Sequence, residues 1–105
     1  MRPFVLSHAA AADLDDIYEY IAKDNPSAAA RLVDAIYDQI VALTQMPGMG
    51  HRRPDLADDP RILIWPVGSY LILYTVQDSP PNAIQVWAIA HGKRDIAALI
   101  RRRGL

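Results

Sequence analysis

The chain has 105 residues and contains no cysteine. Without thiols it can form neither a disulfide nor a zinc–thiolate site, and it has no thiolate nucleophile. Histidine is also scarce, with three in all, and no two of them have the spacing of metal ligands. We therefore expect no metal site and no cofactor.

Long apolar runs are absent as well. No stretch reaches the roughly 20 apolar residues that span a bilayer, and the opening "MRPFVLSHAA" has too short an apolar stretch for a signal peptide. A chain without cysteine suits a reducing compartment. These observations lead us to expect a cytoplasmic protein with no membrane partner, folded as a single domain over residues 1–105.

Charge is distributed unevenly along the chain, although the net charge is only −1. Residues 1–60 carry five basic and ten acidic side chains, whereas residues 61–105 carry six basic and two acidic ones. An anionic partner would be expected on the second, positive half. Segregation of this kind also occurs in proteins that bind nothing charged.

The first half of the sequence predicts a strand and two helices. "PFVLS" (3–7) is a short apolar strand, and Ser7 can cap the amphipathic helix that follows over residues 9–24. Asn25 and Pro26 are typical of a second helix start, and this helix should end near Met46. The short gap between the two helices predicts an antiparallel hairpin.

The second half predicts three strands and a short helix. "RILIW" (61–65), "YLILYTV" (70–76) and "AIQVWAIA" (83–90) are rich in β-branched and aromatic residues and are separated by turn signals. They predict a three-stranded antiparallel meander, and "RDIAALIRRR" (94–103) predicts a short helix after it. The expected fold class is α+β.

The predicted sheet is apolar on both faces, which is unusual for an antiparallel sheet with one wet side. In the last strand, strict alternation places Trp87 and Ile89 on one face. It places on the other face Ile84, Val86, Ala88 and Ala90. The helical hairpin can cover one face, and the tail helix only part of the other. Either these elements suffice, or a partner's amphipathic helix or extended segment covers the remainder.

The last strand ends in a charged corner, "HGKRD" (91–95). Gly92 would permit a backbone conformation closed to most residues, and Asp95 suits the start of the next helix. Lys93 and Arg94 project beside the tail arginines, where they either contact a partner or form an ordinary solvated corner.

The order of elements and four phrases resemble the RelE/ParE family of type II toxins, and most closely its ParE-like branch. The phrases are "AAADLDDIYEYIAKDNPSAAARL" (10–32), "IVALTQMPGMGHRRPDL" (40–56), "YLILYTV" (70–76) and "IAHGKRD" (89–95). The resemblance implies a toxin held inactive by an antitoxin encoded beside it. ParE-like members inhibit DNA gyrase, and RelE-like members cut messenger RNA on the ribosome.

The sequence departs from the RelE-type pattern of catalytic groups. That pattern includes a tyrosine on the tail, and "IAALIRRRGL" has none. If the chain were a ribonuclease, its candidate residues would be Arg61, His91 and Arg94. Arg61 is otherwise a solvated or paired charge, and His91 a hydrogen-bonded residue at a strand end. We therefore favour a gyrase-binding toxin over an enzyme, with a ribosome-dependent ribonuclease or a non-toxic antitoxin partner as alternatives.

The resemblance also suggests where partners bind. We expect a hetero-oligomer with a ribbon-helix-helix antitoxin, which would provide the only link to DNA. The expected antitoxin-binding residues are Trp65, Tyr70, Ile72, Tyr74 and Trp87. The expected target-binding residues are Lys93, Arg94, Arg101, Arg102 and Arg103.

Overall fold

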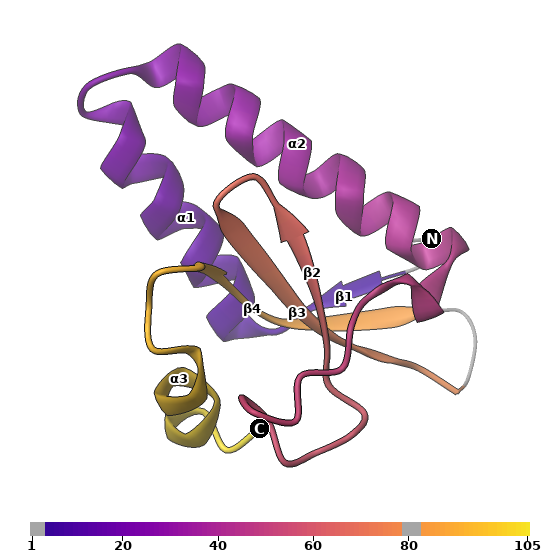
Figure 1. Cartoon of the computed structure of the whole chain (residues 1–105). Helices are drawn as coiled ribbons and strands as arrows, with labels where there is room; N and C mark the ends of the chain where they lie inside the picture. Colours follow the sequence, from indigo (N-terminus) through magenta and orange to yellow (C-terminus); the bar gives the residue numbers. More distant parts are fainter. Residues whose placement is uncertain (1–3, 79–82) are drawn as a thin grey trace.

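The structure is a computed structural model that describes residues 4–78 and 83–105. It confirms the α+β class, with a first strand, a helical hairpin, three further strands and a last helix (Figure 1). A 3-10 turn, η1, follows the hairpin. The elements are β1 (Phe4–Leu6), α1 (His8–Ala22), α2 (Pro26–Gln45), η1 (Pro47–Met49), β2 (Leu63–Val67), β3 (Tyr70–Val76), β4 (Ile84–His91) and α3 (Ile96–Arg102).

Each helix begins at a side chain that caps its first turn. Ser7 Oγ accepts a hydrogen bond from the Ala10 amide, and Asn25 Oδ1 accepts one from the Ala28 amide, each at 3.0 Å. Asp95 caps α3 in the same way through the Ala98 amide, at 3.0 Å. Because these oxygens satisfy amides that have no partner within the helix, they fix where each helix starts.

The four strands form one sheet in the order β1-β4-β3-β2. The meander β2-β3-β4 is antiparallel, as predicted. β1 lies parallel to β4 on its other side, so β4 occupies the interior of the sheet. β2 begins at Leu63, two residues later than expected, because Arg61 and Ile62 donate their amides to Asp59 in a turn. It runs through Pro66, which an edge strand tolerates.

A β-bulge changes which residues of β4 face the helices. Leu73 pairs with Ala88 and Tyr74 pairs with Val86, so Trp87 is left as an extra residue. The bulge reverses the alternation beyond this point. Ile89 therefore joins Val86 beneath the hairpin, and the prediction that these two residues lie on opposite faces is wrong.

Both faces of the sheet are packed. α1 and α2 cover one face, and α3 lies against the other (Figure 1). The second face is also covered by residues of the loop before β2, which the sequence did not suggest. Much of this face is thus buried by the chain itself, more than the tail helix alone was expected to cover. Its buried residues are Ala57, Ile62, Ile64, Leu73, Ala88, Ala90, Ile96, Leu99 and Ile100.

Among the described residues, none of the helices combines the length and apolar character required to cross a bilayer.

Candidate functional site

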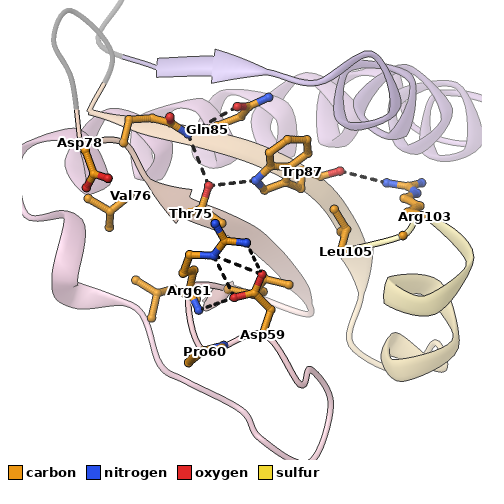
Figure 2. Close-up of a pocket in the computed structure, with 14 residues that line it drawn as sticks. Asp59, Pro60, Arg61, Thr75, Val76, Asp78, Gln85, Trp87, Arg103 and Leu105 are labelled. Atoms are coloured by element: carbon orange, nitrogen blue, oxygen red, sulfur yellow. Dashed lines mark hydrogen bonds and ion pairs between the residues drawn. The ribbon is translucent and has the colours of Figure 1, made fainter.

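The second face of the sheet remains open at one end, where α3 and the loop before β2 stop short of each other. The opening is a groove of about 730 Å³, which we call the sheet groove (Figure 2). Its floor comes from β3 and β4, one rim from the loop before β2, and the other rim from the segment after α3. The lining residues are Asp59, Pro60, Arg61, Ile62, Leu63, Thr75, Val76, Gln77, Asp78, Gln85, Trp87, Arg103, Gly104 and Leu105.

The floor of the sheet groove combines an aromatic ring with polar side chains. Trp87 donates from Nε1 to Thr75 Oγ1 at 2.9 Å (Figure 2). Gln77 Nε2 lies 3.4 Å from both Thr75 Oγ1 and Gln85 Oε1. The bulge leaves Trp87 without a residue directly opposite it in the register with β3. Such a floor offers both apolar contact and hydrogen bonds to a ligand that lies across it.

Arg61 and Asp59 form the rim on the loop side. Arg61 Nη2 lies 2.8 Å from Asp59 Oδ2, and Arg61 donates to the same carboxylate from Nε and from its backbone amide. These hydrogen bonds lower the pKa of Asp59 from its ordinary value of 3.8 to about 2. The Arg61 side chain is 81% exposed. It is therefore a paired surface charge, which is the alternative that the sequence left open.

Arg103 ties the end of α3 to α1. Its Nη2 and Nη1 donate to the two carboxylate oxygens of Asp13 at 2.7 and 2.8 Å, and Nη1 also donates to the Trp87 carbonyl at 3.2 Å. Asp13 further accepts the Ile89 amide at 2.9 Å, beyond the point where β1 ends. The side chains of Arg103 and Asp13 are only 23% and 9% exposed.

This ion pair corrects one predicted role. Arg103 was expected to contact the target, but its guanidinium is already engaged on two acceptors within the fold. The hydrogen bonds to Asp13 also raise the pKa of the Arg103 guanidinium, which keeps it charged. Asp13 itself was missed by the sequence reasoning. The sequence does contain an indication of its role. Asp13 lies three residues after Ala10 and four before Ile17, which places an acid on the apolar side of the helix.

A second recess lies at the opposite end of β3, between α1 and the corner after β4. It has a volume of about 470 Å³, and we call it the corner cleft. Its residues come from α1, from the start of β3, and from the end of β4 with the turn that follows. They are Asp13, Asp16, Ile17, Tyr20, Tyr70, Ile89, Ala90, His91 and Arg94.

The corner itself is held by local hydrogen bonds. His91 Nδ1 accepts the Lys93 amide at 3.1 Å, and the His91 ring meets the Tyr70 ring edge-on, with centroids 5.1 Å apart. The Gly92 amide donates to the Ser69 carbonyl at 2.7 Å.

Gly92 serves a different purpose from the one expected. It does not have a positive φ. Instead, a Cβ atom on Gly92 would lie 3.3 Å from the Ser69 carbonyl oxygen, so a glycine suits the close approach of two backbones.

The residues predicted to bind an antitoxin are scattered. Ile72 and Tyr74 are completely buried beneath the hairpin, so no partner can reach them in this fold, and their assignment is wrong. Trp65 is half-buried against the same core and donates from Nε1 to Gln39 of α2 at 2.8 Å. Tyr70 lines the corner cleft, and Trp87 lines the sheet groove.

The three residues predicted for a ribonuclease are not brought together. Arg61 precedes β2, whose first residue pairs with Tyr74, whereas His91 pairs with Tyr70. The two positions lie near opposite ends of β3: Tyr74 and Tyr70 are four residues apart, about 14 Å at the rise of an antiparallel strand, and Arg61 lies two residues before the start of β2. Arg94 is near His91 only. Within residues 4–78 and 83–105, no three acidic or histidine side chains are grouped so that they could hold a metal ion.

The remaining cationic residues predicted to face a target are on the surface. Lys93 and Arg94 are exposed on the corner after β4, and Arg101 and Arg102 are exposed in the last turn of α3.

The fold has the architecture of the ParE-like toxins. A chain in a solved structure described as "Chromosomal ParDE TA system from P. aeruginosa" superimposes with a TM-score of 0.67 at 26% sequence identity. The match covers 87% of this chain and 96% of that one. A comparison with curated proteins finds no match.

The family assignment comes from a family model. The model described as "ParE toxin of type II toxin-antitoxin system, parDE" matches residues 4–96. The chain belongs to this family of type II toxins, and the resemblance noted from the sequence is confirmed.

Proposed function

We propose that the protein inhibits DNA gyrase in the cytoplasm and that a cognate antitoxin neutralises it. Membership of the ParE toxin family, over residues 4–96, carries this proposal. The geometry agrees with it, because the acid–base candidate His91 and the cation Arg61 lie near opposite ends of β3. Cleavage of a phosphodiester requires such groups around one phosphate.

The antitoxin, in this proposal, occupies the sheet groove. The similarity to a chain of a ParDE system supports an antitoxin partner, and the groove is large enough for several side chains of an extended or helical segment. Its apolar side chains would lie on Trp87 and on Val76, which is 45% exposed. Its polar groups would bond to Thr75 and Gln85. Contact with DNA would then come through a ribbon-helix-helix domain of the antitoxin.

The test of the gyrase proposal is expression of the chain alone from a tightly repressed promoter. We expect growth arrest, induction of the DNA-damage response, and gyrase trapped on cleaved DNA. With purified components, the protein should convert supercoiled plasmid to linear product only when gyrase and ATP are present. Growth arrest with intact DNA would contradict the proposal.

Arg61→Ala separates gyrase inhibition from RNA cleavage. A gyrase inhibitor should retain its toxicity in this variant, because the Arg61 side chain is paired with Asp59 and is not needed for gyrase inhibition. Transcript cleavage on ribosomes that disappears in Arg61→Ala or His91→Ala would instead identify a ribonuclease. Normal growth on expression of the unchanged chain would identify a non-toxic antitoxin partner.

A further inference from the structure

The corner cleft contains an exposed aromatic side chain, Tyr20, that is not part of either apolar core. Tyr20 projects from α1 with 74% of its surface exposed, which is the highest value among the large hydrophobic residues of the described chain. Tyr70 and His91 stand on the other side of the same cleft. Tyrosine and arginine are over-represented among the residues that dominate protein–protein binding energies, and Arg94 completes the lining.

The cations of the corner are free to meet a partner. In the described part of the chain, Arg53, Arg61 and Arg103 each form an ion pair with an aspartate, whereas the side chains of Lys93 and Arg94 form none. Asp13, the most buried acid in the cleft, is already neutralised by Arg103. Lys93 and Arg94 would therefore attract a carboxylate to the edge of an aromatic recess.

The acidic residues of α1 decide between a protein and a nucleic acid. Asp16 lines the cleft, and Asp15 and Glu19 are exposed on the same helix. Asp15 and Glu19 line a neighbouring recess between α1 and α2, and together with Asp16 they would repel a phosphate backbone that runs along α1. A protein segment with a single acidic side chain, held at the edge formed by Lys93 and Arg94, meets less of this repulsion.

The corner cleft is also separate from the sheet groove. The groove opens on the face of α3 and includes residues from the Val76 end of β3, whereas the cleft lies against α1 and includes Tyr70 at the other end. The two recesses share no lining residue.

We propose that the corner cleft is the surface through which this toxin contacts its target protein. An acidic side chain of the target would bind Lys93 and Arg94, and a neighbouring apolar side chain would lie between Tyr20 and Tyr70. The inference rests on the proposed function in taking gyrase as that target. It assigns target and antitoxin to different surfaces, so the two binding activities can be abolished separately.

The test compares Tyr20→Ala and Arg94→Glu with matched controls elsewhere. Tyr18→Ala removes another exposed tyrosine of α1, and Arg31→Glu reverses an exposed cation on α2; neither residue lines the cleft. Binding to purified gyrase A and B subunits is measured for each protein, together with growth arrest and the urea midpoint of unfolding. The two cleft variants should bind gyrase at least tenfold more weakly with unchanged midpoints, and the controls should stay within twofold of the original chain.

Each outcome decides a different question. If the original chain traps gyrase on cleaved DNA and the cleft variants do so equally well, the inference about the cleft is wrong and the proposed function stands. If the original chain arrests growth without binding gyrase or trapping it on DNA, the proposed function fails. Loss of growth arrest in the two cleft variants, but not in the controls, would then still support the corner cleft as the target-binding surface. Binding to plasmid DNA without gyrase that disappears in Arg94→Glu would overturn the assignment to a protein segment.

Discussion

At the scale of single residues, Tyr74 shows how the fold accommodates a polar group in its core. Among the residues that the structure describes, it is the largest completely buried side chain. Its hydroxyl donates to the Pro47 carbonyl at 2.7 Å and accepts the Gly50 amide at 2.9 Å. A buried hydroxyl without partners would destabilise the fold, so the turn after α2 has to pass directly over this ring.

The close passage predicts a large effect of Gly50→Ala. A Cβ atom at this position would lie 2.5 Å from Tyr74 Oη and 2.8 Å from Cε1, so the ring or the turn must move. We expect the free energy of unfolding to fall by about 1–3 kcal/mol, measured by urea denaturation. Gly48→Ala is the matched control, since no atom lies within 4 Å of its added Cβ. Equal stability of the two variants would refute this interpretation.

A second prediction at this scale concerns pH. The pKa of Asp59 is lowered to about 2 by Arg61, so Asp59 should remain ionised at pH 3. Because the folded pKa lies below the ordinary value, any stabilisation from this pair is present above about pH 4 and is lost as the pH falls towards 2. An NMR titration of the carboxyl carbon should show this midpoint. In Arg61→Ala the midpoint should rise towards 3.8, and an unchanged midpoint would exclude the Arg61 side chain as the cause.

At the scale of elements, α3 depends on the rest of the chain. It has seven residues, and a helix of this length is unstable in isolation. Three features hold it in place: the Asp95 cap, the burial of Ile96, Leu99 and Ile100, and the Arg103–Asp13 ion pair.

Asp13→Ala should therefore loosen α3 although the substitution lies in α1. It leaves the Ile89 amide without its acceptor and Arg103 without its carboxylate. We expect a loss of about 2–4 kcal/mol in the free energy of unfolding and faster hydrogen exchange in α3.

Asp55→Ala is the control for Asp13→Ala, because it breaks an exposed pair with Arg53 and should leave stability unchanged. Slow exchange of the α3 amides in Asp13→Ala would show that the ion pair does not hold this helix.

At the scale of the whole molecule, the two apolar cores share β3 and β4 and should unfold together. Trp65 reports on the hairpin side, and Trp87 on the sheet groove. In the variants Trp87→Phe and Trp65→Phe, which keep one tryptophan each, the fluorescence transition should coincide with that of far-UV circular dichroism. A fluorescence transition at lower urea in the variant that keeps Trp87 would show that the α3 side unfolds independently.

The sequence predicted the helices and strands of the molecule but not all the contacts between them. Caps and periodicity located the helices, and the meander followed from three apolar runs. The bulge at Trp87 was not predictable, because alternation assumes an unbroken register. Ile72 and Tyr74 were mistaken for contact residues because a local pattern does not say which face the hairpin covers. Arg103 looked like its neighbours, since its partner Asp13 is 90 positions away.

The position of β4 has a consequence for synthesis. This strand lies inside the sheet, between β1 and β3, yet it is the last of the four strands to leave the ribosome. Until β4 emerges, β1 has no strand to pair with, and the apolar face of the helical hairpin is only partly buried. A prematurely terminated product that stops before β4 would contain neither recess in complete form. A truncated translation product should consequently be harmless to the cell and a ready substrate for proteases.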